Sequence, residues 1–358
     1  MSIYIIAEAG VNHNGSMSMA FELIHAAHEC GADAVKFQTF KTEKLVTRDA
    51  RKASYQNEND SSTSSQSEML KQLELTDVQF IELSEECKRV GIDFLTTCFD
   101  SSSLEVICRE TGLKKLKIGS GDITNLPLII DHSRTGLDII ISTGMSTMSE
   151  IEDALAAIAF GHFTKSGNPE NYDWLKLNYF TEDKIARIRD KVTILHCVTD
   201  YPASHEDLNL NAIKIIQQAY GINTGYSDHT LGLEACCAAV ALGATCLEKH
   251  LTLDPSLPGP DHKASATPED FKALVTATRN IEKSMIPLIK SPTVRERANL
   301  EVARKYLVAA IDISEGECFT AENVDIKRSK IGISPQLYWD VIGKSAKRNF
   351  SQGESIFM

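Results

Sequence analysis

Eight short, nearly continuous apolar runs recur along this chain, and helical patterns separate most of them. The runs lie at residues 3–7, 34–39, 93–97, 115–119, 138–143, 192–197, 223–227 and 245–250. The helical patterns cover residues 17–30, 76–90, 102–111, 148–160, 207–219 and 232–242. Apolar strands that alternate with helices are typical of a parallel sheet buried on both faces. Eight such units over about 280 residues predict a (β/α)8 TIM barrel, with a doubly wound sheet as the alternative.

Two segments interrupt this alternation. Residues 48–72 are polar and rich in serine, and they predict a long loop after the second strand. Residues 161–191 form an insertion before the sixth strand. Because this insertion precedes a strand, we expect it on the barrel face opposite the site. The sequence alone assigns no function to either segment.

The character of the sequence changes after the last predicted helix, at 268–283. A charged stretch with a proline, 286–302, predicts a linker, and residues 303–358 combine short β-like runs with turn signals. We therefore expect a catalytic barrel at 1–285, followed by the linker and a small β-rich domain. A domain of about 55 residues has a marginal core, so it is expected to lean on the barrel or on another subunit.

The charge and cysteine pattern excludes several classes of protein. A net charge of −12 argues against broad binding to nucleic acid or to an anionic membrane surface. The nine cysteines include no C-x-x-C pair, and several lie in apolar runs, which indicates reduced thiols in a cytoplasmic protein. The first residues lack the basic and apolar regions of a signal peptide, and no apolar run approaches the roughly 20 residues of a spanning helix.

Polar side chains gather where the predicted strands end, which in a parallel barrel is one rim and the usual place of the active site. They are Glu8, Lys36, Gln38, Thr97, Lys117, Ser120, Asp122, Ser142, Thr199, Tyr201, Ser227, His229, Glu248, His250 and Asp261. Lys36 and Lys117 stand in apolar strands, so each is expected to face an anion, with an internal Lys–Glu pair as the structural alternative. The Gly-Ser-Gly after Lys117 and the Ser-Thr-Gly of 142–144 offer hydroxyl and N–H groups that suit phosphate.

Two further roles follow from position at the rim. Glu8 ends the first strand, where burial can tune its pKa for acid–base chemistry, and Asp122 and Asp261 are the next candidates. An ion pair with Lys36 is the structural alternative for Glu8. His229 and His250 end neighbouring predicted strands, so their imidazoles are expected close enough to bind one metal ion. The alternative is a pair of hydrogen-bonded histidines without a metal.

Nine segments, in this order, resemble the sialic acid synthase family, whose members make nonulosonic acids. They are IIAEAGVNHNGS (5–16), GADAVKFQTF (31–40), KIGSGDITNLPLI (117–129), ISTGM (141–145), LHCVTDYPA (195–203), DLNLNAI (207–213), GYSDHT (225–230), ALGATCLEKHLTLD (241–254) and GPDHKAS (259–265). They cover nearly the whole predicted barrel. The tail, with DIKRSKIGIS, resembles the family's C-terminal antifreeze-like (SAF) domain.

The resemblance implies condensation of phosphoenolpyruvate (PEP) with the open-chain aldehyde of an N-acylated mannosamine, with release of phosphate. N-acetylmannosamine would give N-acetylneuraminate. A 2,4-diacetamido-6-deoxy hexose would instead give a legionaminic- or pseudaminic-type acid. The motifs do not separate these two acceptors.

The same resemblance assigns roles to individual residues. His229 and His250 match the ligands of a divalent metal, Mn²⁺ first and Mg²⁺ or Co²⁺ as alternatives, which polarises the sugar aldehyde. Glu8 matches the carboxylate of proton transfer. The positions that match PEP-binding residues are Lys36, Lys117, Ser120 and Ser142, with Thr97 and Thr199 nearby. The positions that match the site lining and the sugar are Gln38, Tyr201, Ser227 and Asp261.

The resemblance also implies a homodimer in which the small domain of one subunit caps the barrel of the other. Arg328 matches the arginine that this domain brings to the N-acyl group. Two departures stand out. Cys98 replaces a usual proline, and Ser-Lys-Ile-Gly follows Arg328 where the family has Pro-Gly-Asn-Gly.

Two other functions are compatible with a barrel of this kind, because a fold does not fix a function. One is a Schiff-base aldolase that uses Lys36 or Lys117. The other is a carbohydrate-binding protein without activity, which the convergence of Glu8, two lysines and two histidines argues against.

Overall fold

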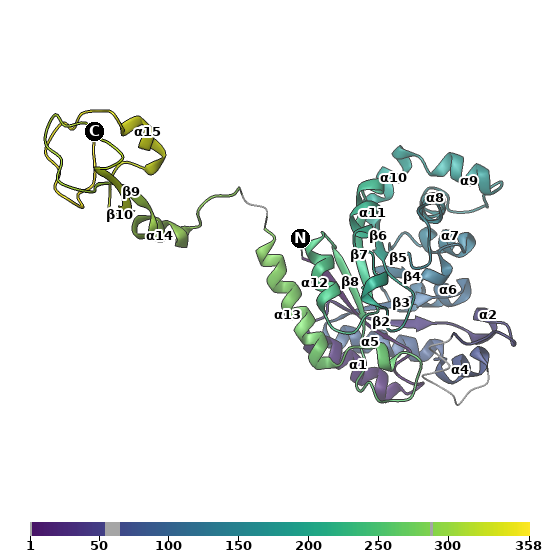
Figure 1. Ribbon diagram of the computed structural model, residues 1–358. Coiled ribbons are helices and arrows are strands. Elements are labelled where there is room, and N and C mark those ends of the chain that lie inside the picture. Colours follow the sequence, from purple (N-terminus) through teal and green to yellow (C-terminus); the bar gives the residue numbers. More distant parts are fainter. Residues whose placement is uncertain (1, 54–64, 287–288) are drawn as a thin grey trace. The chain divides into compact units, whose positions relative to one another are not determined.

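The computed structural model describes residues 2–53, 65–286 and 289–358 (Figure 1). The chain forms two compact units, Met1–Ile286 and Pro287–Met358. Part of the predicted 48–72 loop, residues 54–64, lies outside the described residues. Each unit is described by itself below.

The first unit is a closed barrel of eight parallel strands. They are β1 (Tyr4–Gly10), β2 (Ala34–Thr39), β3 (Asp93–Cys98), β4 (Lys115–Ile118), β5 (Asp138–Ser142), β6 (Val192–His196), β7 (Asn223–Asp228) and β8 (Cys246–His250). Each strand pairs with its neighbours in sequence, and β8 closes the barrel on β1. The predicted barrel is confirmed, and the doubly wound alternative is excluded.

Helices surround the strands of this unit (Figure 1). They are α1 (Met17–Cys30), α2 (Thr42–Leu45), α4 (Gln66–Leu73), α5 (Asp77–Val90), α6 (Ser101–Glu110), α7 (Leu126–Arg134), α8 (Met148–Phe163), α9 (Tyr172–Tyr179), α10 (Glu182–Ile188), α11 (Ala212–Tyr220), α12 (Glu234–Ala241) and α13 (Pro268–Ser284). Capping boxes, in which the first and fourth residues of a segment satisfy each other's free backbone N–H groups, start α5, α8 and α13.

The structure differs from the sequence predictions at three helices. The end of the 48–72 segment is the helix α4, not a loop. Helix α7 had not been predicted between β4 and β5. Helix α11 begins at Ala212, five residues after the predicted start, because a 3-10 turn occupies His205–Asp207.

One layer of apolar side chains fills the barrel interior below the site. It consists of Ile6, Ala34, Leu95, Ile140, Leu195 and Cys246. Because side chains alternate along a strand, the residues two positions further on point to the same interior. On β1, β2, β3, β5 and β8 these residues are Glu8, Lys36, Thr97, Ser142 and Glu248. The fold therefore places a polar layer directly above an apolar one at the carboxyl ends of the strands.

The 161–191 insertion packs on the outer side of α8 through α9 and α10. The ring of Tyr179 lies 4.9 Å from that of Phe160, and Trp174 joins the same aromatic group. Neither α9 nor α10 contributes a side chain to the pocket described below.

The second unit contains α14 (Val294–Ala303), β9 (Lys305–Ala309), β10 (Val324–Arg328) and α15 (Tyr338–Val341). Strands β9 and β10 pair antiparallel, and Leu307, Phe319 and Phe350 belong to its own small core. The small β-rich domain is thereby confirmed. Helix α14 covers the second half of the predicted linker, 286–302, and ends one residue beyond it.

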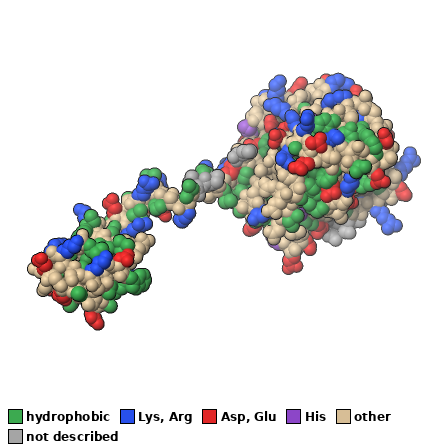
Figure 2. All heavy atoms as spheres, turned by 90° about the horizontal axis from the view of Figure 1, so that it is seen from above, with side chains coloured by type: hydrophobic (Ala, Val, Ile, Leu, Met, Phe, Trp, Pro, Cys, Tyr) green, Lys and Arg blue, Asp and Glu red, His purple; other side chains and the backbone are tan. Residues whose placement is uncertain are grey.

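Lysine and arginine side chains mix with acidic ones over the visible face of the barrel unit (Figure 2). Within the described residues, no helix combines the length and the apolar character needed to cross a membrane.

Candidate active site

One pocket at the carboxyl ends of the strands brings together the site residues predicted in the barrel, apart from Asp122. They are Glu8, Lys36, Gln38, Thr97, Lys117, Ser120, Ser142, Thr199, Tyr201, Ser227, His229, His250 and Asp261. The pocket also contains Glu248, which the sequence placed at the rim without a role. Asp122 does not line it and instead accepts a hydrogen bond from Asn125. Arg328 ends β10 in the second unit, so its role stays a prediction.

Two lysines and two glutamates form the floor of the pocket. Lys36 Nζ lies 2.7 Å from Glu8 Oε2 and 3.7 Å from Glu248 Oε2. Lys117 Nζ lies 3.3 Å from Glu248 Oε1, which also accepts a hydrogen bond of 3.0 Å from Ser227. The structural alternative of internal Lys–Glu pairs is therefore what the structure shows. Both pairs line the pocket, so they also meet whatever enters it.

The pocket shifts the pKa values of the two glutamates in opposite directions. Burial raises the pKa of Glu8; Lys36 opposes that shift, and the Glu248 carboxylate adds to it. Although burial alone would raise the pKa of Glu248, Lys117 and Lys36 lower it to about 2. Two carboxyls whose environments separate their pKa values are the usual arrangement for one acid–base group beside one fixed charge. Glu8 is the group suited to exchange a proton, and Glu248 is the fixed anion.

His229 and His250 lie side by side, with ring centroids 5.7 Å apart. His229 Nδ1 lies 2.5 Å from the carbonyl oxygen of Val198, so Nδ1 carries the hydrogen and Nε2 keeps a free lone pair. His250 Nδ1 is buried and has no hydrogen-bond partner among the described residues. Burial lowers the pKa of His229 to about 4 and holds that of His250 well below its usual value, so both rings are neutral near pH 7.

The ring nitrogens of this histidine pair suit a divalent metal, because metal binding requires neutral imidazoles and a fixed tautomer. No cluster of three or more histidine, cysteine or acidic side chains suited to a metal occurs in residues 2–53, 65–286 and 289–358. The chain would therefore supply two imidazoles, and water or substrate would complete the shell. The ring centroid of Tyr201 lies 4.1 Å from that of His229, with the two planes tilted by 31°.

A second, fully buried ion pair lies behind the histidines, on the outward-facing positions of β7 and β8. Lys249 Nζ lies 2.6 Å from Asp228 Oδ2 and donates to the carbonyl oxygen of Thr230 at 2.7 Å. Asp228 Oδ1 accepts from the N–H and the hydroxyl of Thr230. The pair thus ties the residues next to His229 and His250 to each other.

Replacing Asp228 with asparagine is expected to lower the free energy of unfolding by about 3–5 kcal/mol, because it leaves the Lys249 ammonium buried without a counter-charge. Chemical denaturation measures this. The control is Asp138→Asn, which removes a carboxylate paired with the half-exposed Lys115 and Lys191. That change should cost about 1 kcal/mol or less. Equal effects of the two substitutions would show that the Asp228–Lys249 pair has no special role.

Hydroxyl groups line the side of the pocket formed by β4, β5 and β6. The Ser142 hydroxyl is buried and has no partner among the described residues, so it is available to a ligand. The Gly144 N–H donates to Ser120 Oγ at 3.0 Å. A side chain at Gly144 would place its Cβ 2.1 Å from Thr199 Oγ1, which explains why a glycine stands there.

Asp261 closes the pocket next to His250. Its Oδ2 lies 3.9 Å from His250 Nδ1, and the Ser265 hydroxyl holds its backbone carbonyl at 2.6 Å. Burial raises the pKa of Asp261 to about 7, and the charge of Glu8 adds to the shift. Near neutral pH this carboxyl can therefore donate as well as accept a hydrogen bond.

A comparison with protein families identifies the chain. The model of the NeuB family matches residues 23–290, and that of the SAF domain matches residues 304–358. The chain belongs to the NeuB family. The sequence resemblance to sialic and nonulosonic acid synthases is thereby confirmed, and the NeuB chain carries its SAF domain at the C-terminal end.

Individual relatives match the NeuB chain over almost its full length. The N,N'-diacetyllegionaminic acid synthase of Campylobacter jejuni is 42% identical over 352 residues, 98% of each chain. The enzyme of the same name from Legionella pneumophila is 39% identical over 356 residues, 99% of this chain and 94% of its own. A crystal structure of N-acetylneuraminic acid synthetase from Leptospira borgpetersenii matches with a TM-score of 0.68 and 31% identity, over 84% of this chain and 91% of that one.

Proposed function

We propose that this protein condenses PEP with the open-chain form of a 2,4-diacetamido-6-deoxy hexose to give a legionaminic-type nonulosonic acid and phosphate. The observation that carries the reaction class is the pocket itself, in which Lys36, Lys117, Glu8 and two neutral histidines converge. The choice of acceptor rests on the relatives from C. jejuni and L. pneumophila, which are named for N,N'-diacetyllegionaminic acid. They favour this sugar over N-acetylmannosamine, the first acceptor that the sequence suggested.

The anionic end of PEP would bind on the β2 and β4–β6 side of the pocket. Lys36 and Lys117 supply cations, Thr97 lies 3.5 Å from Lys36 Nζ, and Ser142 offers an unused hydroxyl. Ser120 and Thr199 flank that hydroxyl in the same pocket. An arriving phosphate or carboxylate would replace Glu8 and Glu248 as the ion-pair partner of the two lysines. The ammonium groups would therefore have an opposite charge beside them both before and after binding.

The aldehyde would lie beside His229 and His250. A divalent metal held by these two imidazoles, Mn²⁺ in the first place, would supply Lewis-acid polarisation of the carbonyl. Gln38, Tyr201, Ser227 and Asp261 line the same region and would orient the sugar hydroxyls. Asp261, with its pKa near 7, is suited to hold a proton at one of them.

The reaction forms one C–C bond and breaks one C–O bond. C3 of PEP attacks C1 of the aldehyde, whose oxygen takes up a proton, and C2 gains cationic character. Water adds to C2 and gives up a proton, and the C2–O bond to phosphate then breaks as the new C2 hydroxyl becomes the keto oxygen and its proton leaves with the phosphate. Glu8 is the group placed to move these protons, since it lines the pocket beside Lys36 and burial raises its pKa above the ordinary value of a carboxyl.

A Schiff-base aldolase fits the geometry less well. A lysine that forms a Schiff base needs a lowered pKa so that its amine is free. Although burial opposes the shift, Glu248 and Glu8 raise the pKa of Lys36. The site therefore keeps this lysine charged.

Arg328 belongs to the same proposal. It lies at the end of β10, and more than a third of its surface is exposed. We propose that it reaches the N-acyl group of the acceptor bound in the barrel of a second subunit.

The test is phosphate release from PEP by purified protein with Mn²⁺, using the 2,4-diacetamido-6-deoxy hexose and N-acetylmannosamine in parallel. Release that requires the sugar and stops with EDTA supports the reaction. A higher kcat/KM with the diacetamido sugar supports the acceptor. Release with N-acetylmannosamine alone would keep the reaction and change the product, and silence with both sugars would refute the synthase.

A further inference from the structure

One side of the otherwise polar pocket is apolar. Val11, Met69, Leu70, Leu73 and Phe99 line it together. The first four belong to one cluster of buried side chains, and Phe99 packs against that cluster. This cluster is separate from the barrel core, so its apolar surface faces the pocket because of α4 and not because the core extends there.

This apolar wall comes from the β1–β3 arc of the barrel. Val11 follows β1, Phe99 follows β3, and α4 lies in the connection between β2 and β3. In a closed barrel of eight strands, β2 lies across from β6. The wall therefore lies across the pocket from the hydroxyl groups of the β4–β6 side, whereas Lys36 of the proposed anion site belongs to the same arc as the wall. The histidines of β7 and β8 lie between the two sides along the rim.

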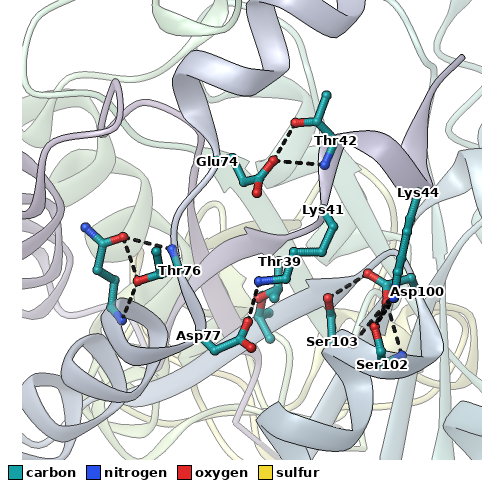
Figure 3. Close-up of polar contacts among 12 residues, drawn as sticks. Thr39, Lys41, Thr42, Lys44, Glu74, Thr76, Asp77, Asp100, Ser102 and Ser103 are labelled. Carbon is teal, nitrogen blue, oxygen red and sulfur yellow. Dashed lines mark hydrogen bonds and ion pairs between the residues drawn. The ribbon is translucent and has the colours of Figure 1, made fainter. Parts of the chain in front are cut away.

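Polar contacts fix the connection that carries the wall (Figure 3). Glu74, just after α4, accepts hydrogen bonds from the N–H and the hydroxyl of Thr42 at the start of α2, at 3.0 and 2.7 Å. Lys41 forms an ion pair of 2.5 Å with Asp77 of α5, and Lys44 forms one of 3.3 Å with Asp100. These contacts hold α2, α4 and the start of α5 and α6 to one another.

The same end of α4 also approaches the β1–α1 loop closely. A Cβ at Gly15, whose φ is +74°, would lie 2.6 Å from the carbonyl oxygen of Gln72. The ring of Phe40 lies edge-on to that of Phe99 at 6.3 Å, which fixes the far side of the wall. The apolar surface is thus a preformed part of the pocket.

We propose that Met69, Leu70 and Leu73, with Phe99, form a subsite for a terminal methyl group of the acceptor and discriminate against a hydroxyl at the same carbon. This inference rests on the proposed function and deepens it, because it assigns the 6-deoxy end of the sugar to a place in the fold. The aldehyde carbon lies at the histidines, so the opposite end of an extended six-carbon chain reaches furthest from β7 and β8. A methyl there would meet side chains that offer no hydrogen bond.

The same surface would reject a 6-hydroxyl by leaving it without a partner. A hydroxyl buried against apolar side chains loses its hydrogen bonds to water and gains none in return. Such a mismatch in a binding pocket costs about tenfold to a hundredfold in kcat/KM. The wall would therefore set the acceptor preference without touching the reacting carbons.

The experiment compares two acceptors that differ by one oxygen atom: the 2,4-diacetamido-6-deoxy hexose and the same sugar with a 6-hydroxyl. Phosphate release from PEP gives kcat/KM for each. The native protein should prefer the 6-deoxy acceptor by about tenfold or more, and Leu70→Asn should reduce this preference to about threefold or less. The KM for the 6-deoxy sugar should rise while the KM for PEP changes much less, because the Leu70 side chain offers no polar group to an anion.

Two further variants keep the result interpretable. Met69→Gln makes the same test at a second position, in case Leu70→Asn folds poorly. Leu45→Asn is the matched control, because Leu45 packs against the same cluster but does not line the pocket. The acceptor preference of this variant should equal that of the native protein. Phosphate release with equal kcat/KM for both acceptors would overturn the subsite and leave the synthase intact. An unchanged preference in both pocket variants would overturn it too. Absence of phosphate release with every sugar would contradict the proposed function itself.

Discussion

Replacing Glu8 by glutamine is expected to lower kcat by about 10²- to 10⁴-fold, the range that general acid–base groups contribute. Glutamine keeps the shape of the side chain and can still accept the 3.1 Å hydrogen bond from Gln38, but it cannot exchange a proton. Lys36 would retain Glu248 as its nearest anion, at 3.7 Å. The KM for PEP should therefore change much less than kcat. Steady-state phosphate release measures both.

The control for this prediction is Asp122→Asn. Asp122 also follows a barrel strand, and burial raises its pKa, yet its side chain does not line the pocket. Its removal should change kcat by less than about threefold, within what an ordinary rim substitution does. If Glu8→Gln and Asp122→Asn had similar small effects, Glu8 would be an ion-pair partner of Lys36 and nothing more.

Replacing His250 by alanine is expected to reduce activity by about 10³-fold. It removes one of the two protein ligands of the proposed metal, and with that ligand several kcal/mol of transition-state stabilisation from carbonyl polarisation. A second readout is direct binding of Mn²⁺, followed by calorimetry in the absence of substrates. The native protein should bind the ion, and His250→Ala should bind it more than about tenfold more weakly. His229→Ala should behave in the same way.

His196→Asn is the matched control for the metal prediction. His196 also ends a barrel strand, but its ring contacts the carbonyl oxygen of Leu208 at 2.7 Å and does not line the pocket. Asparagine can replace that hydrogen bond, so Mn²⁺ binding should stay unchanged. Native Mn²⁺ affinity in both His250→Ala and His229→Ala would mean that the ion binds elsewhere.

The barrel and most of its rim were predictable because both follow from local patterns. Eight apolar runs mark the strands, and parallel strands bring their last residues to one rim. Knowing only that rule, one can expect Glu8, Lys117 and His229 in one pocket although more than 200 residues separate the first from the last. The direction of each side chain then follows from the alternation along the strand.

The rest depends on tertiary contacts that no local pattern records. Glu248 was visible at the end of β8, but its position between Lys36 and Lys117 follows only from the closure of the barrel and the register between strands. The inward alternation Cys246, Glu248, His250 was the one signal that could have identified it.

Helix α4 was missed for a different reason. Its eight residues follow a serine-rich stretch, and only Met69, Leu70 and Leu73 are apolar, too few to show a helical period. What stabilises it is the packing of these three side chains with Val11 and Phe40, which lie far away in sequence. The apolar wall of the pocket could therefore not be predicted from the sequence.

The most direct measurement follows the bridging oxygen of PEP. The protein is incubated with Mn²⁺, the 2,4-diacetamido-6-deoxy hexose and PEP that carries ¹⁸O between C2 and phosphorus, and both products are analysed by mass spectrometry. C–O cleavage predicts that the label leaves with phosphate and that the nine-carbon acid takes its C2 oxygen from water. Label retained in the sugar acid, or labelled phosphate that forms without any acceptor, would contradict the account.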